Sequence, residues 1–287
     1  NQNIAVIKTD ENLLNPFYLT VFLNSKYGRE QLWMLSRQSE QFNLSCRELE
    51  ELLIPLFDTD FQQEIEILAK NSLDLIKKAK SLYSQAENLL LEELGLKGFQ
   101  VKYELFYTTN LSKAFGVHRI DAEYFQTTYD SFIGCLKEHS KIAKVKEFIL
   151  DFQKLKPLYE PKVGDFLLTK DVMPGIAYVV KEPVGGIAAG SILILKINEN
   201  KVNKEYLALC INSIIGKLQI KREGGGVITH WRPEQIKNLQ VPVLSKKVQQ
   251  EISSFIKQSH KTKQRAKELW EEVKRKVEKA IENEIRK

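Results

Sequence analysis

Small and apolar residues recur at steps of three and four along two long stretches of the chain. In residues 60–94 this seam holds Ile65, Leu68, Ser72, Leu75, Ala79, Leu82 and Ala86. In residues 247–286 it holds Ile252, Phe255, Ser259, Thr262, Ala266, Leu269 and Val273. Neither stretch contains Pro or Gly, so the pattern predicts two uninterrupted helices, each spanning on the order of 50 Å.

We expect these two helices to pack against each other through the heptad seam, as a coiled coil. The residues expected at the helix-pair interface are Ile65, Leu68, Leu75, Leu82, Ile252, Phe255, Leu269 and Val273. Ser72, Ser259 and Thr262 also fall on the seam, where polar side chains weaken a coiled coil but help to set its register. The alternative is that each stretch is an amphipathic helix packed only on its own domain.

Shorter elements precede each long stretch. The aliphatic runs at 4–7 and 192–195 predict buried strands. Asn15, which is followed by Pro, and Asn203 predict helix N-termini, because Asn caps helices and Pro suits the first helical turn. Gly28 and Gly216 then lie near plausible helix breaks.

Polar stretches at 36–43 and 221–232 follow these helices and predict loops. Each of these loops leads to a short segment that ends at Pro55 or Pro242, where Pro should block further strand pairing. Strand-like runs at 163–169 and 177–180, separated by turn residues, indicate mixed, β-rich structure in the middle of the chain.

The elements recur because the chain contains an internal repeat. Residues 4–28 align with residues 192–216 at an offset of 188, without a gap, and ten of the 25 positions are identical. Further along the offset is 187, and the run Gln62–Ile65 coincides with Gln249–Ile252. A unit of about 190 residues has the size of a whole domain with a connector, so the pattern indicates a tandem duplication of domains.

About one and a half units are present, because residues 99–187 have no earlier counterpart. We expect four segments: the C-terminal half of a first domain (1–58), a first long helix (59–96), a complete second domain (97–244) and a second long helix (245–287). Asn1 and the residues after it provide neither an initiator Met nor a basic leader. We therefore expect the sequence to start inside a longer gene product.

Composition narrows the class of protein. With 43% hydrophobic and 28% charged residues the chain resembles soluble globular proteins, and no apolar run reaches the roughly 18 residues of a membrane span. The net charge of +6 is compatible with nucleic-acid binding but does not require it. Cys46, Cys135 and Cys210 form no C-x-x-C pair, so we expect neither a disulfide framework nor a zinc site, in a reducing cytoplasm.

The sequence contains no recognisable catalytic motif. Nucleotide-binding Gly-rich loops, a Walker loop, His-Glu-x-x-His and the Asn/Asp-Pro-Pro-Tyr motif of methyltransferases are all absent. Asp121, Glu123 and Asp165 are carboxylates for which capping or surface roles are expected. We therefore expect no catalytic residues, no metal and no cofactor in this chain.

In the order of its motifs, the chain resembles the specificity subunits of type I restriction-modification systems of prokaryotes. The matching residues are Arg119-Ile-Asp-Ala-Glu-Tyr-Phe, Val163-Gly-Asp-Phe-Leu, Asn-x-x-Tyr-Leu at Asn15 and Asn203, Ile54-Pro55 with Val241-Pro242, and Gln-Gln-Glu-Ile at Gln62 and Gln249. The resemblance covers almost the whole chain. No single motif is specific, but their order and their recurrence at one offset are hard to imitate.

This resemblance implies an α+β fold in which two target-recognition domains are joined by two long antiparallel coiled-coil helices. It implies a non-catalytic subunit that reads a bipartite target in double-stranded DNA. It also implies methyltransferase and restriction subunits as partners, with S-adenosylmethionine bound by the methyltransferase. The departure from the family pattern is the missing first half of the first recognition domain, which puts binding to a bipartite target in doubt.

Loop residues are the expected DNA contacts, because loops can follow a groove while the core holds them in place. Arg and Gln side chains can bond to base edges, and Lys more often binds phosphate. The candidates are Arg37, Gln38, Gln41, Lys154, Lys156, Lys170, Lys221, Arg222, Thr229, His230 and Arg232. For each of them, an ordinary solvated side chain is the alternative.

Two rival functions remain open at this point. One is the DNA-recognition region of a single-chain restriction-methyltransferase, which requires methyltransferase sequence upstream of Asn1. The other is a coiled-coil interaction scaffold whose loops do not bind DNA.

Overall fold

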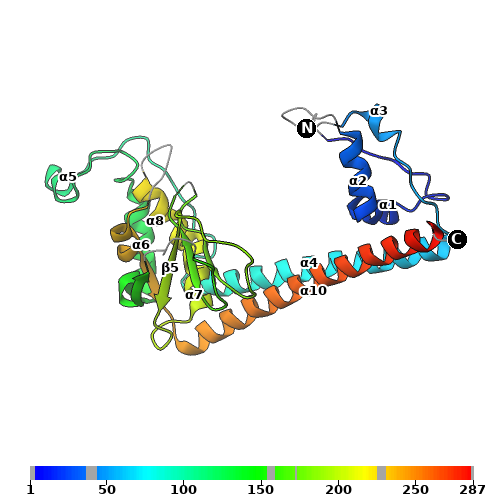
Figure 1. The fold of residues 1–287 in the computed structure, drawn as a ribbon. Coiled ribbons are helices and arrows are strands. Elements are labelled where there is room, and N and C mark those ends of the chain that lie inside the picture. Colours follow the sequence, from blue (N-terminus) through cyan, green and yellow to red (C-terminus); the bar gives the residue numbers. More distant parts are fainter. Residues whose placement is uncertain (1–3, 37–43, 154–158, 172, 225–230, 286–287) are drawn as a thin grey trace. The chain divides into compact units, whose positions relative to one another are not determined.

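The computed structural model describes residues 4–36, 44–153, 159–171, 173–224 and 231–285. The chain divides into two units: unit 1 is formed by Asn1–Ser81 with Gln258–Lys287, and unit 2 by Leu82–Lys257. Two long helices, α4 (Thr59–Glu93) and α10 (Lys246–Ile285), each contribute to both units (Figure 1).

Unit 2 is built on a four-stranded antiparallel sheet. Its strands lie in the order β2 (Ile149–Gln153), β5 (Ile192–Ile197), β3 (Phe166–Thr169) and β4 (Ala177–Val179). A separate antiparallel pair joins β1 (Lys141–Lys144) to β6 (Gln240–Val243). In β3, Phe166 and Leu168 are buried and alternate with less buried neighbours, as expected for a strand with one face on the core.

Helices complete unit 2. They are α5 (Leu111–Val117), α6 (Thr127–His139), the 3₁₀ turn η1 (Val145–Glu147), α7 (Lys204–Asn212), α8 (Ile214–Gly224) and α9 (Pro233–Asn238). Helix α7 contacts β4, β6 and α8, and its residues Glu205 to Ile211 are all buried. The core extends from the sheet through Phe132 of α6 to Leu90 of α4 and Ile252 of α10.

The described residues of unit 1 form three shorter helices, α1 (Pro16–Asn24), α2 (Lys26–Leu35) and α3 (Cys46–Leu49). Its core joins Tyr18 and Phe22 of α1 to Ile65 of α4 and Val273 of α10. As the sequence predicted, Asn15 caps α1 by accepting hydrogen bonds from the backbone of Phe17 and Tyr18.

The fold class predicted from the sequence is confirmed: the chain is α+β, and α4 packs against α10. Contacts of Glu64 with Lys276 and of Ala79 with Ser259 show that the helices run antiparallel within unit 1. Among the expected interface residues, Ile65, Ile252 and Val273 are buried. The others, Leu68, Leu75, Leu82, Phe255 and Leu269, are half-buried.

The internal repeat is visible as the same hydrogen bonds in both units. In unit 1 the Tyr18 hydroxyl donates to the carbonyl of Pro55 at 2.6 Å, and in unit 2 that of Tyr206 donates to Pro242 at 2.8 Å. The side-chain oxygen of Gln62 accepts from the Asn15 backbone at 2.8 Å.

Two more repeated contacts complete this framework. Gln249 accepts from the Asn203 backbone at 3.0 Å, as Gln62 does from Asn15. Gln31 exchanges two hydrogen bonds with the backbone of Leu53, and Gln219 does the same with Gln240. Each unit therefore fixes its helix pair, its Pro-containing segment and the start of its long helix in the same way.

Some local predictions are wrong. Residues 4–7 form no strand, and Ile4, Val6 and Ile7 are exposed. Their counterparts in β5 pair with β3, and Ile194 and Leu195 pair with β2 as well, whereas no described strand lies beside residues 4–7. Without a neighbouring strand, the backbone groups of this run have no ladder partners and are left to water.

The first helix of each pair ends at Asn24 or Asn212, four residues before the glycine that was expected near the break. Two other boundaries differ from the predictions. Residues 221–224 belong to α8 and not to a loop. Pro242 lies inside a paired strand opposite Ile142, which is possible because β6 is paired on one side only.

The glycines have a steric role in close helix packing instead. A Cβ on Gly216 would lie 2.0 Å from the carbonyl oxygen of Ile211, and one on Gly28 would lie 2.2 Å from that of Phe22. These contacts are with backbone, which cannot rotate away. Only glycine therefore fits where the second helix of each pair turns back on the first.

Gly216→Ala is expected to lower the free energy of unfolding by about 1–3 kcal/mol, because the added methyl must push α7 and α8 apart. Urea unfolding measures the change. Gly134→Ala in α6 is the matched control, since a Cβ there meets nothing within 4 Å, and it should be neutral or stabilising by up to about 1 kcal/mol. Equal losses in both variants would contradict the steric explanation.

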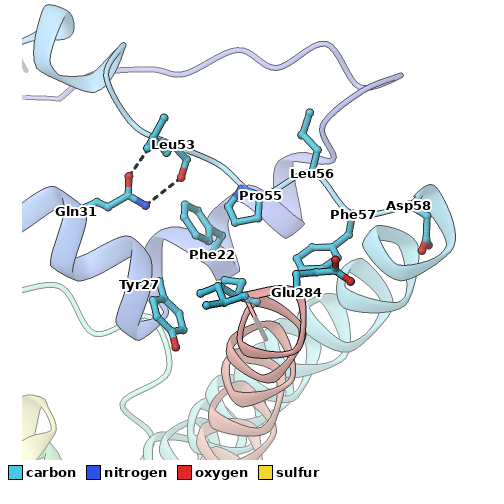
Figure 2. A pocket seen from close by; sticks show the side chains of 11 residues that line it. Phe22, Tyr27, Gln31, Leu53, Pro55, Leu56, Phe57, Asp58 and Glu284 are labelled. Atoms are coloured by element: carbon cyan, nitrogen blue, oxygen red, sulfur yellow. Dashed lines mark hydrogen bonds between the residues drawn. The ribbon is translucent and has the colours of Figure 1, made fainter. Parts of the chain in front are cut away.

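A pocket of about 760 Å³ opens in unit 1 beside the Gln31–Leu53 hydrogen bonds (Figure 2). Its walls include Phe22, Tyr27 and Phe57. In unit 2 the equivalent residues are Cys210, Ile215 and Leu244, and all three are buried. There α6 packs against α8, and the Cys135 sulfur of α6 lies 4.0 Å from the carbonyl oxygen of Leu94.

Candidate nucleic-acid interface

The structure describes only part of the expected DNA-contact set. Seven candidates lie outside the described residues: Arg37, Gln38, Gln41, Lys154, Lys156, Thr229 and His230. The other four, Lys170, Lys221, Arg222 and Arg232, all belong to unit 2. The described part of the candidate interface therefore consists of these four residues and their neighbours.

Arg222 lies in the last turn of α8 and is engaged within its own unit. Its guanidinium donates to the carbonyl of Tyr124 at 3.1 Å and pairs with Asp130 at 3.1 Å. The guanidinium carbon also lies 4.8 Å from the centre of the Tyr124 ring, and the side chain is 18% exposed. Because these contacts satisfy much of the guanidinium fork, Arg222 has little capacity left for a base edge.

Arg119 contacts the same tyrosine ring as Arg222. It makes two hydrogen bonds to Asp121, at 2.7 and 3.0 Å, and one to the carbonyl of Glu223 at 3.0 Å. Its guanidinium carbon lies 4.5 Å from the centre of the Tyr124 ring. The hydrogen bond from Arg119 is the largest cause that holds the pKa of Asp121 below its ordinary value.

We call Arg119, Asp121, Tyr124, Asp130 and Arg222 the arginine brace. It ties the segment before α6 to the end of α8 through charge-assisted hydrogen bonds and two guanidinium groups over one aromatic ring. Such hydrogen bonds are stronger than neutral ones, and Arg stacks well on aromatic faces. The brace therefore holds the C-terminal end of α8 in a fixed place within unit 2.

Lys221, next to the brace, is the more accessible of the two neighbouring cations, with a side chain 52% exposed. Its amine lies 2.5 Å from the Tyr103 hydroxyl and 3.7 Å from Glu123. The hydrogen bond with Tyr103 raises the pKa of Lys221, so this side chain carries its positive charge at neutral pH.

Lys170 and Arg232 are both neighbours of a buried tryptophan, Trp231. The backbone of Trp231 donates to the carbonyl of Lys170 at 2.7 Å, and Trp231 is 3% exposed. Lys170 is half-buried and pairs with Asp171 at 3.3 Å, while Arg232 is exposed at the start of α9. The buried ring of Trp231 thus fixes the backbone segments that carry Lys170 and Arg232.

The structure brings Lys221 and Arg222 together, and separately Lys170 and Arg232. Sequence reasoning missed the role of Arg119, which it quoted only as part of a motif. The two-residue spacing of Arg119 and Asp121 was a usable signal for a local ion pair. Its partner Glu223, more than a hundred residues away, was not readable from any local pattern.

Neither a metal-binding cluster nor a membrane-spanning helix was found in the parts of the chain that the structure describes. No group of three or more His, Cys, Asp or Glu residues is placed to hold a metal ion among these residues. None of the described helices combines the length and apolar character needed to cross a bilayer.

Comparison with known proteins gives one family. A family model described as "Type I restriction modification DNA specificity domain" matches residues 120–275, more than half of the chain. No curated protein matches the sequence.

Several chains of solved structures are similar to this chain. One is the S subunit of a type I restriction-modification system from M. genitalium, with 13% identity and a TM-score of 0.44, covering 92% of this chain and 71% of that one. Another comes from work on complex assembly and conformational transition of the type I R-M system, with 14% identity and a TM-score of 0.32. It covers 96% of this chain and 72% of that one.

Proposed function

The chain belongs to the family of type I restriction-modification DNA specificity domains, and from this premise we propose that it reads a bipartite target in double-stranded DNA. Each of its repeated units would contact one half of the target. The chain would position methyltransferase and restriction subunits on that DNA, in the cytoplasm. Methyl transfer and cleavage would be carried out by those partners, with S-adenosylmethionine bound to the methyltransferase.

The observation that carries this proposal is the repeated framework of hydrogen bonds. Tyr18 with Pro55 in unit 1 and Tyr206 with Pro242 in unit 2 hold equivalent segments in equivalent places. A protein with two copies of one platform is suited to a target with two separate recognition sequences. Residues 36–43 and 221–232 differ most between the copies, which allows the two halves to read different bases.

The proposed role of the long helices is to act as a ruler between the two contacts with DNA. Helices α4 and α10 contain no Pro or Gly, the residues most often found at helix kinks. A change in their length is then expected to change the length of the DNA spacer that is accepted between the two half-sites.

The decisive experiment measures sequence preference. The chain, together with its methyltransferase partner, is presented with a randomised DNA library at moderate salt, and bound sequences are read. We expect a split motif with a fixed spacer. Binding without any preference among sequences would reject the recognition role, and a single undivided motif would reject the bipartite target.

Lys170→Ala and Arg232→Ala test where the chain meets phosphate. Each should weaken binding several-fold for every DNA sequence and reduce the slope of log affinity against log salt by about one. Lys77→Ala, which removes an exposed charge paired with Asp74 on α4, is the matched control and should leave the slope unchanged. A loss confined to particular sequences would instead assign base contacts to Lys170 or Arg232.

A further inference from the structure

Two buried serines of unit 1 make the same hydrogen bond in opposite directions between α4 and α10. The hydroxyl of Ser72 on α4 donates to the carbonyl of Ala266 at 2.9 Å. The hydroxyl of Ser259 on α10 donates to the carbonyl of Ala79 at 2.6 Å. Ser72 and Ser259 are 1% and 8% exposed. We call these two bonds the serine clasp.

The clasp has a local two-fold symmetry that comes from the internal repeat. The offset of 187 residues that relates the two long helices takes Ser72 to Ser259 and Ala79 to Ala266. Ser72 bonds to Ala266, and its counterpart Ser259 bonds to Ala79, which is the counterpart of Ala266. The two contacts are therefore equivalent, as in a self-complementary dimer interface. Both alanines are buried, and their small side chains let the two backbones approach within reach of a serine hydroxyl.

The observed register places a buried alanine opposite each serine. The donors and acceptors lie seven residues apart on each helix, so a shift of one helix by one heptad breaks both bonds at once and moves each hydroxyl to another backbone carbonyl. A shift in one direction would bring Val273, a buried β-branched residue of the core, opposite Ser72. The buried hydroxyls would then need new partners, since burying a hydroxyl without a hydrogen bond is unfavourable.

Other contacts in unit 1 discriminate less between registers. Apolar residues repeating every seven positions can meet other apolar residues after a heptad shift, because their packing is not directional. The ion pair of Lys276 with Glu64 joins two partly exposed side chains, and such surface pairs contribute little. The serine clasp is thus a buried, directional contact made by α4 and α10 with each other in this unit.

We propose that the serine clasp fixes the axial register of α4 against α10, which makes Ser72 and Ser259 determinants of DNA spacer length. The second part rests on the proposed function, in which the helices act as a ruler. A slip of one heptad displaces one helix along the other by about 10 Å, which corresponds to roughly three base pairs. Ser72 and Ser259 are positioning residues and touch no DNA.

The first test measures the register directly, without DNA. Spin labels replace the exposed Lys78 and Lys261, both in unit 1, in the full chain with Cys46→Ser and Cys135→Ser. Pulsed electron paramagnetic resonance should give one distance for the parent chain. In Ser72→Ala with Ser259→Ala a second distance, displaced by up to about 10 Å, should appear, because two lost hydrogen bonds reduce the preference for one register roughly 30-fold.

Two matched variants show whether the hydroxyls are responsible. Ser84→Ala changes an exposed serine of α4 and should keep the single distance. Ser72→Thr with Ser259→Thr keeps both hydroxyls and should return most molecules to the parent distance. A single, unshifted distance in the double alanine variant would overturn the clasp as a register determinant.

The second test uses a DNA library with spacers of every length between the two half-sites. The parent chain with its methyltransferase partner should select one spacer, and the double alanine variant should also accept a spacer about three base pairs longer or shorter. A second distance in the spectrum together with an unchanged spacer would overturn the specificity role alone. Absence of any sequence preference in the parent chain would instead reject the proposed function, while the spectroscopic result would still decide the register.

Discussion

Gln249→Leu is expected to lower the free energy of unfolding by about 3 kcal/mol. Gln249 is 4% exposed and bridges two backbone groups: its oxygen accepts from Asn203 at 3.0 Å and its nitrogen donates to Leu244 at 2.9 Å. Leucine has a similar volume but satisfies neither group, and each buried group left without a partner costs about 1–3 kcal/mol. Urea unfolding followed by circular dichroism measures this loss.

Gln62→Leu is the matched variant in unit 1, because Gln62 bonds to Asn15 and Phe57 as Gln249 does to Asn203 and Leu244. Its additional bond is to the carbonyl of Leu13, an exposed residue whose carbonyl water can reach. The bond of Gln62 to Phe57 is only partly buried, whereas that of Gln249 to Leu244 is buried, so the Gln62 variant should lose less, about 2 kcal/mol. A loss below about 0.5 kcal/mol in both variants would contradict the view that these glutamines hold each framework together.

The parts of the fold that the sequence predicted well are those determined by local spacing. The long helices were expected at 60–94 and 247–286, and they occupy Thr59–Glu93 and Lys246–Ile285. A helix repeats its environment every few residues, so the pattern of buried positions is readable without knowledge of the partner. The capping role of Asn15 was readable for the same reason, since a cap acts on residues two and three positions away.

Predictions that depended on distant segments were less successful. Residues 4–7 and 192–195 look alike in sequence, yet only the second run lies in a strand, because only there do neighbouring strands supply hydrogen-bond partners. The roles of residues in the candidate interface are difficult to predict for the same reason. Lys221 and Arg222 look equally suitable for DNA, but the contacts with Tyr124 and Asp130 that occupy Arg222 come from about a hundred residues away.

This difference between neighbours gives the two cations different expected roles. Arg222 is 18% exposed and belongs to the arginine brace, whereas Lys221 is 52% exposed and carries its charge near the surface. If the proposed DNA interface lies at this end of α8, Lys221 contributes charge directly. Arg222 contributes by keeping the end of the helix in place.

Arg222→Ala is accordingly expected to lower the free energy of unfolding by about 2 kcal/mol, because it removes a hydrogen bond to Tyr124 and the ion pair with Asp130. Affinity for the DNA target should fall at least tenfold, as the brace no longer holds α8. Arg222→Lys keeps the charge but not the planar fork, so it should recover less than half of either loss.

Lys221→Ala, the control at the adjacent position, should change the free energy of unfolding by less than about 0.5 kcal/mol. Urea unfolding and fluorescence anisotropy with target DNA measure the two quantities for all three variants. The brace predicts that stability and affinity both fall in Arg222→Ala. In Lys221→Ala, affinity should fall while stability stays nearly unchanged. If Arg222→Lys retains full affinity while Arg222→Ala keeps parental stability, then Arg222 acts as a phosphate contact and not as part of a brace.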